Sequence, residues 1–126
     1  MENPPKIWDA VRRRWLVLTP EEWVRQHLIR LLVERGGVPP GNVSQEYPVA
    51  VTGRDGRPCL LAECKAPDVP LGREVFAQAV RYNSVVAAPY VLITNGLLHC
   101  CSSLDRSTGR YAVVEGLPDL SPFLGI

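Results

Sequence analysis

The chain has 126 residues, of which 46% are hydrophobic and 21% are charged, and its formal net charge is +1. This length predicts one domain spanning residues 1–126, and the near-neutral charge excludes a binder that works through overall charge alone. No apolar run approaches the roughly 18 residues of a membrane span, and the start lacks the apolar segment of a secretory signal. The four cysteines show no C-x-x-C spacing, which argues against zinc. We therefore expect a cytoplasmic protein without membrane contact.

The chain begins with a basic segment, in which Lys6 is followed by Arg12, Arg13 and Arg14. These cations indicate either a solvated surface or a patch that binds phosphate, and the sequence leaves both open.

The first predicted helix begins after Thr19, in the stretch TPEEWVRQHLIRLLVERGG. Thr19 and Glu22 have the spacing of a capping box, with Pro20 at the first helical position. The helix is expected to end at Gly36–Gly37. Helical spacing predicts one buried face, made by Trp23, Val24, His27, Leu28, Leu31 and Leu32.

The remaining elements alternate between strands and one further helix. VSQEYPVAV (43–51) predicts one strand, TGRDGRP a turn, and CLLAECK (59–65) a second strand that completes a hairpin. A helix over 73–88, strands over 89–94, 97–103 and 111–116, and an irregular tail follow. The predicted order αββαβββ indicates an α/β (α+β) fold with a mixed sheet flanked by helices.

Two charged residues stand at the end of the second strand, where Glu63 and Lys65 share one face. A carboxylate, the backbone carbonyl of Cys64 and a second acid are oxygen ligands suited to Mg²⁺ or Mn²⁺. The lysine would then orient or help deprotonate an attacking water. A pair on a solvated strand is the alternative.

The second helix carries polar side chains at regular spacing. Gln78 and Tyr82 lie four residues apart on one helical face, and Arg73 and Arg81 form a neighbouring row. Such a surface can meet a phosphodiester, although Glu74 would repel phosphate. A solvated helix face is the alternative.

Four segments in order carry a resemblance to a known family: IWDAVRRRWLVLTPEEWVRQHLIRLL, GRPCLLAECKAP, FAQAVRYN and APYVLITNGLLHCC. From about Lys6 to Pro118 the chain resembles the N-terminal nuclease domain of type I restriction enzyme R subunits, in particular its small stand-alone members. The resemblance implies the PD-(D/E)xK nuclease superfamily, with a restriction-endonuclease-like αβββαβ core, here with an added C-terminal hairpin strand, and DNA as substrate.

The resemblance also implies roles for individual residues. Glu63 and Lys65 match the E-x-K pair, and Gln78 and Tyr82 match a supporting Q-x-x-x-Y motif. Glu22 matches a glutamate of the first helix that reaches the metal region in related nucleases, with capping as its competing role.

One part of the family pattern is not found. The family places an aspartate one strand before E-x-K, in a segment similar to R-A-D-I-V-V, whereas EYPVAV here runs directly into TGRDGRP. We therefore expect either that one strand and its aspartate are absent, or that a stretch between Pro48 and Thr52 is omitted. Glu46 aligns with another acidic position and is, with Glu22, a candidate second metal ligand.

These observations favour a Mg²⁺-dependent DNA endonuclease, acting alone or as a homodimer. The alternatives are a catalytically impaired nuclease-fold module that binds nucleic acid or a protein, and a structural domain whose tail LPDLSPFLGI covers the sheet or docks on another chain. No G-x-x-x-x-G-K-[ST] loop is present, which excludes ATP-driven translocation.

Overall fold

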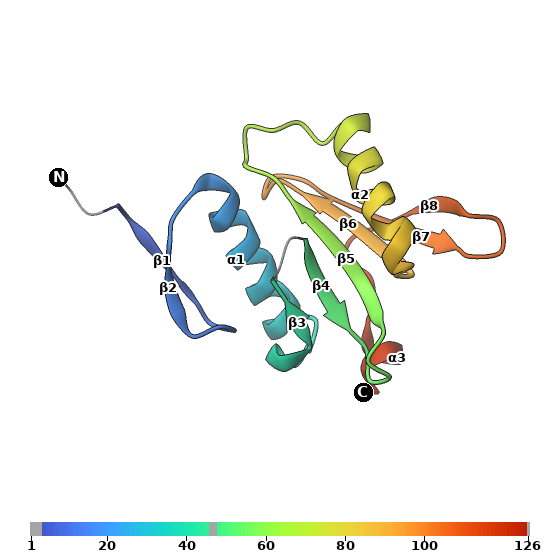
Figure 1. The fold of residues 1–126 in the computed structure, drawn as a ribbon, viewed down its shortest axis with the longest axis horizontal. Helices are drawn as coiled ribbons and strands as arrows, with labels where there is room; N and C mark the ends of the chain where they lie inside the picture. The colour runs from blue at the N-terminus through green and yellow to red at the C-terminus, as the bar shows by residue number, and fades with distance from the viewer. Residues whose placement is uncertain (1–3, 46–47, 126) are drawn as a thin grey trace.

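The computed structural model describes residues 4–45 and 48–125 (Figure 1). Its helices are α1 (Pro20–Glu34), a short 3₁₀ helix (Pro40–Asn42), α2 (Arg73–Val86) and α3 (Ser121–Leu124). Its strands are β1 (Lys6–Asp9), β2 (Arg14–Val17), β3 (Val43–Ser44), β4 (Val49–Thr52), β5 (Pro58–Cys64), β6 (Tyr90–Thr94), β7 (His99–Asp105) and β8 (Arg110–Val114). Within these ranges no helix has the length and apolarity needed to cross a membrane.

The predicted start of α1 is confirmed. The Thr19 hydroxyl accepts a hydrogen bond from the Glu22 backbone N–H at 3.0 Å, which satisfies one of the free N–H groups of the first turn. The helix ends slightly before the predicted glycines, with Arg35 as its C-cap. Its buried face includes Val24, Leu28 and Leu32, as well as polar residues.

Six strands form the main sheet, in the order β3-β4-β5-β6-β7-β8. Every neighbouring pair is antiparallel except β5 and β6, which are parallel and joined by α2. The sheet, its flanking helices and the added β7–β8 hairpin confirm the predicted fold class.

The expectation of a missing strand was wrong, because the segment predicted as one strand over 43–51 contains two. β3 and β4 pair antiparallel, with Val43 opposite Val51 and Ser44 opposite Ala50. Pro48 directly precedes β4 and has no N–H for a ladder, which is consistent with a break there. The order α1-β3-β4-β5-α2-β6 is therefore αβββαβ, and β4 is continuous over Val49–Thr52.

The two long helices cover opposite faces of the sheet. Leu60, Ala62 and Cys64 belong to the hydrophobic cluster that includes α1, whereas Val91 and Ile93 belong to a second cluster with Val75 and Ala79 of α2. Because side chains alternate along a strand, each face of β5 and β6 meets its own helix. Figure 1 shows α1 and α2 separated by the central strands.

The C-terminal tail covers this chain's own sheet. Leu120 and Leu124 are buried in the cluster on the α1 side, and Phe123 makes an edge-on contact with Tyr90 at 6.1 Å. The Phe123 carbonyl also accepts a hydrogen bond from the Arg54 N–H at 2.8 Å. Part of this tail forms α3, where the sequence predicted irregular structure.

Candidate functional site

The centre of the candidate site is an ion pair at the end of β5. Lys65 Nζ lies 3.3 Å from Glu63 Oε1, and Glu63 is only 1% exposed. Glu63 is paired in the sheet with Ile93, whose side chain packs against α2, so the carboxylate points to the α2 face. The predicted meeting of these two side chains is thus present in the structure.

The backbone fixes the position of the residue between them. The Lys65 N–H donates to the Thr94 carbonyl at 2.8 Å, which places this backbone group toward β6. Successive residues of a strand direct their backbone groups to opposite edges, so the Cys64 carbonyl is directed to the β4 edge. The Cys64 thiol is buried on the α1 face, and burial raises its pKa to about 12. Cys64 can therefore offer its carbonyl oxygen to a cation, but its thiol stays protonated.

The neighbouring strand β4 supplies no carboxylate to this centre. Val49 pairs with Ala62, and extending this register by one residue places the buried Pro48 opposite Glu63. The residues of β4 itself are Val-Ala-Val-Thr. In the described parts of the chain no three His, Cys, Asp or Glu side chains gather as a metal group. Glu46, one of the two predicted second ligands, lies outside the described residues.

The other predicted second ligand, Glu22, belongs to a polar network on α1. Its carboxylate accepts a hydrogen bond from Gln26 at 2.9 Å and forms an ion pair with Arg25. Since α1 covers the opposite face of the sheet, the structure does not bring Glu22 onto the face to which Glu63 points. The capping position predicted for this residue is present.

The network continues from α1 to β1 and to Gln45, the residue that follows β3. Gln26 donates to the Gln45 side chain at 2.9 Å, and Gln45 donates to Asp9 at the same distance. Arg12 donates to Asp9 at 2.5 Å. Asp9 is fully buried. The sequence did not predict this burial, because an aspartate shortly before three arginines is typical of an exposed charged segment.

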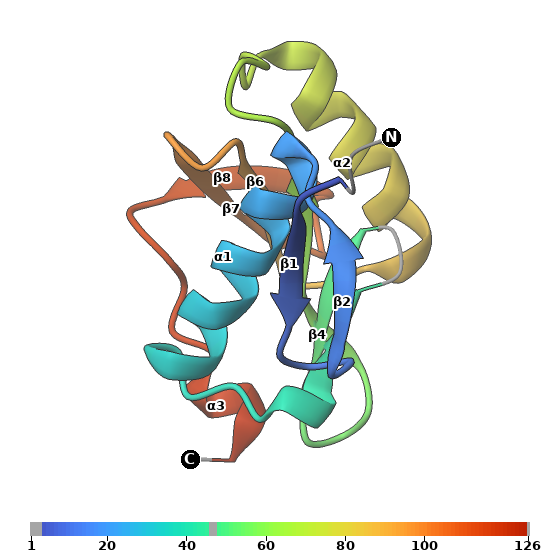
Figure 2. The same ribbon diagram turned by 90° about the vertical axis from the view of Figure 1, so that its left-hand side faces the viewer.

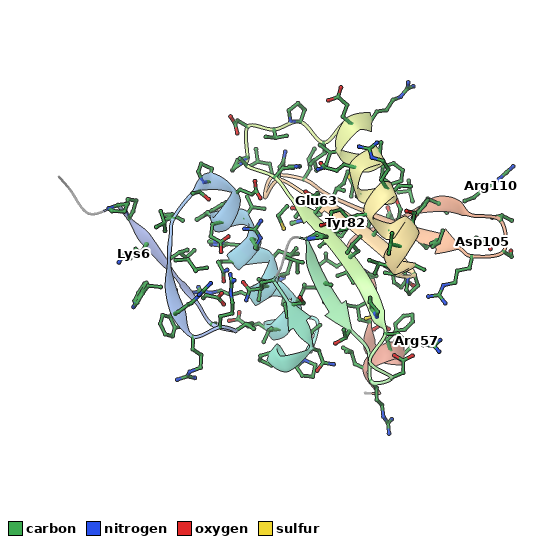
Figure 3. All side chains as sticks on the ribbon, viewed as in Figure 1. Lys6, Arg57, Glu63, Tyr82, Asp105 and Arg110 are labelled. Atoms are coloured by element: carbon green, nitrogen blue, oxygen red, sulfur yellow. The ribbon has the colours of Figure 1, made fainter. Side chains whose placement is uncertain are left out.

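Gln78 and Tyr82 line one groove on α2, as their spacing predicted. The groove has a volume of about 530 Å³ and is completed by Arg81, Val85 and Val86. Tyr82 is 40% exposed. Because α2 packs against β5 and Glu63 faces α2, the groove lies on the same side of the sheet as the ion pair (Figure 3).

The two predicted phosphate-binding arginines do not share this groove. Arg81 is part of it, whereas Arg73 lines a separate hollow at the start of α2, together with Phe76 and Tyr111. Both arginines are exposed. They therefore offer two separate positive charges along α2.

The far end of α2 is held by a buried asparagine. The Asn83 amide donates to the Ala88 carbonyl at 3.0 Å, and its carbonyl oxygen accepts from the Ala88 N–H at 2.9 Å. Asn83 also donates to the Tyr111 hydroxyl at 3.1 Å. These bonds fix the end of α2 against the loop before β6 and against β8, and so fix the groove relative to the sheet.

A comparison with protein families shows which family this chain resembles. Residues 20–118 match the model described as type I restriction enzyme R protein N terminus. This range includes α1, the ion pair and the α2 groove, but not β1 and β2. No curated protein matches the chain. No solved structure matches it either.

Proposed function

Because this chain belongs to the family of the type I restriction enzyme R protein N terminus, we propose that it acts on DNA and hydrolyses phosphodiester bonds with a divalent cation. The observation that carries the proposal is the buried Glu63–Lys65 pair at the end of β5. A carboxylate and an ammonium held 3.3 Å apart combine a cation ligand with a proton-handling group at one point. A role on DNA also favours a cytoplasmic location.

The residues fit a cation that is completed by the substrate. Glu63 and the Cys64 carbonyl are oxygen donors, and Mg²⁺ is often bound through one or two carboxylates together with substrate phosphates and water. When bound, Mg²⁺ or Mn²⁺ would neutralise charge on the phosphate. Among the residues that the structure describes, Glu63 is the carboxylate at this centre. We therefore expect cation binding to be weak without DNA and to strengthen when DNA is present.

The chain's own residues would divide the remaining work. The Lys65 ammonium would orient the attacking water and lower the cost of its deprotonation. Gln78 and Tyr82 would contact the DNA backbone from the α2 groove, as hydrogen-bonding side chains that do not repel phosphate. Arg73 and Arg81 would add positive charge along the same helix.

A cleavage assay tests the proposal. Supercoiled plasmid and linear DNA are incubated with the intact chain in Mg²⁺, in Mn²⁺ and in chelator, and the products are separated on gels. We expect cation-dependent cleavage that is lost in Lys65→Ala and in Glu63→Gln and is retained in Arg110→Ala. Arg110 is an exposed residue of β8, and Figure 3 shows it far from Glu63. Cleavage by Lys65→Ala at the wild-type rate would contradict the assignment.

A second candidate function is DNA binding without hydrolysis. It is favoured by the register of β4, which places Pro48, the residue before the strand and not an acid, opposite Glu63. This candidate predicts salt-dependent binding and no cleavage in any cation. Fluorescence anisotropy across a salt series measures it: the double variant Arg73→Ala/Arg81→Ala should lower the slope of log affinity against log salt by about one for each arginine that contacts phosphate. An unchanged slope would exclude the α2 arginines from the DNA contact.

A further inference from the structure

The hairpin of β1 and β2 is a separate feature of the molecule. It precedes the residues matched by the family model, and the site at Glu63 makes no use of it. The Leu18 N–H closes its open end by donating to the Pro5 carbonyl at 2.8 Å. Figure 1 shows the hairpin on the side of α1 that faces away from the main sheet, and Figure 2 shows it facing the viewer.

One face of the hairpin exposes aromatic surface. Trp8 is opposite Trp15 and Lys6 is opposite Val17, so these four side chains share a face. The two indole rings meet edge to face, with centroids 5.3 Å apart and planes at 64°. Trp15 is nevertheless 62% exposed and Val17 is 53% exposed. An indole held in place by a second ring, yet open to solvent, is the arrangement of a stacking platform.

The hairpin also concentrates positive charge. Residues 4–18 contain four cations and one carboxylate, a net of +3, whereas the whole chain carries +1, so the rest of it carries a net of −2. Lys6 is exposed on the face of Trp15 and Arg13 is exposed in the turn, whereas Arg14 lies on the opposite face, paired with Asp9. Arg12 is engaged by Asp9. The positive charge beside Trp15 therefore belongs to this segment and not to the chain as a whole.

The hairpin is fixed to the body of the protein through Asp9. Beyond its contacts with Arg12 and Gln45, this buried carboxylate accepts the backbone N–H groups of Val11 and Arg12 at 3.0 and 2.9 Å. The next residue, Arg13, adopts a φ of 54°, a left-handed conformation that arginine rarely takes. The turn that presents Arg13 is thus held by a buried anchor, and its orientation is set before any ligand arrives.

We propose that this hairpin face binds single-stranded DNA. Unpaired bases would stack on Trp15, and the neighbouring phosphates would meet Lys6 on the same face and Arg13 in the turn. Duplex DNA is a poorer ligand because its bases are already stacked and cannot offer a face to the indole. A second copy of this chain is disfavoured because two hairpin segments, each with a net charge of +3, would have to meet. The proposal rests on the proposed function only in taking DNA as the ligand.

Binding of a fluorescent thymidine 20-mer, and of a duplex of the same length, to the intact chain tests this inference. We expect tighter binding of the single strand, quenching of tryptophan fluorescence, and an affinity that falls about tenfold or more in Trp15→Ala. Trp15→Phe, which keeps an aromatic ring, should recover part of this affinity. Trp23→Ala is the matched control, since Trp23 is 40% exposed on α1 and lies against the β6–β7 turn.

Charge is tested in the same assay. Lys6→Gln with Arg13→Gln should lower single-strand affinity and its salt dependence, whereas Arg110→Gln should not. Circular dichroism and thermal unfolding establish that each variant is folded.

The outcomes separate this inference from the proposed function. Glu63→Gln should abolish cleavage and keep single-strand binding. If Trp15→Ala binds the single strand as wild type does while Arg73→Ala/Arg81→Ala weakens binding, the hairpin proposal fails and the α2 surface is the DNA contact. Equal affinity for single strand and duplex, or a dimer in sedimentation that Trp15→Ala dissociates without any DNA binding, would also overturn it.

Discussion

Glu63 Oε1 and Lys65 Nζ lie 3.3 Å apart at the end of a strand whose apolar residues are almost entirely buried. Glu63 is 1% exposed, and 20% of the Lys65 side chain is exposed. A carboxylate taken out of water is stable only with compensating charge or hydrogen bonds. The pair therefore contributes to folding as well as to any chemistry, and the two contributions can be measured separately.

Lys65→Ala should reduce the free energy of unfolding by about 2–4 kcal/mol, because it removes the adjacent cation from a buried carboxylate. Urea denaturation followed by circular dichroism measures the change. The double variant Glu63→Gln/Lys65→Met should lose much less unfolding free energy than the sum of the losses in Glu63→Gln alone and Lys65→Met alone. The reason is that the double variant leaves neither charge without its partner. Arg110→Ala, an exposed control, should change stability by less than about 0.5 kcal/mol. Additive losses would mean that the two side chains do not interact.

Asp9 predicts a dependence of stability on pH. Burial disfavours its carboxylate, but hydrogen bonds from Gln45 and Arg12 outweigh burial and hold its pKa below 3.8. A folded-state pKa below the unfolded one means that the stabilisation is complete above about pH 4 and is lost as the pH falls through the folded value. Asp9→Asn should thus cost about 2 kcal/mol at pH 7, and its difference from wild type should shrink below pH 4.

Denaturation of wild type and Asp9→Asn at a series of pH values from about 2.5 to about 7 measures this difference, because the series covers both sides of the ordinary pKa of an aspartate. Asp68→Asn, at an exposed position of the loop before α2, is the control and should follow the wild type. A constant gap between wild type and Asp9→Asn at every pH would show that the Asp9 charge has no part in the effect.

The sheet could be predicted from the sequence except where a strand is very short. β5 and β6 were clear because long apolar runs are typical of strands covered on both faces. β3 has only two residues, and no periodicity can be read from two residues. It was therefore merged with β4, and the order appeared to lack a strand that the structure contains.

For the residues of the helices, prediction from the sequence succeeded or failed for a different reason. Helical spacing placed Gln78 and Tyr82 together correctly, because they lie on one regular element. It placed Trp23 and His27 on the buried face of α1, whereas both are exposed and pack on each other with centroids 4.3 Å apart. The buried face includes Gln26 instead, whose amide is satisfied by the network with Gln45. Sequence alone cannot show such a partner from a distant segment.

The cap of α1 gives a prediction about local stability. Thr19→Ala removes the acceptor for the Glu22 N–H and should lower the free energy of unfolding by about 1 kcal/mol. Thr19→Ser keeps the hydroxyl and should lose much less. Thermal unfolding of both variants measures the effect, and equal losses would indicate that the hydroxyl does not stabilise the helix.

The four cysteines should differ in reactivity according to their burial. Cys59, Cys64 and Cys101 are buried, and burial raises the pKa of Cys64 to about 12 and that of Cys101 to about 11. Cys100 is exposed and its neighbour Cys101 is buried, because successive side chains on β7 point to opposite faces.

A thiol reagent such as DTNB should therefore modify one cysteine rapidly in the native chain at pH 7.5, and the other three only on unfolding. Cys100→Ser should remove the rapid phase and leave unfolding, cation dependence and DNA binding unchanged. A rapid phase that persists in Cys100→Ser would mean that the strand carrying Cys64 or Cys101 opens readily. In that case the end of β5 could not hold the Glu63 carboxylate and the Cys64 carbonyl in the fixed positions that the proposed cation site needs.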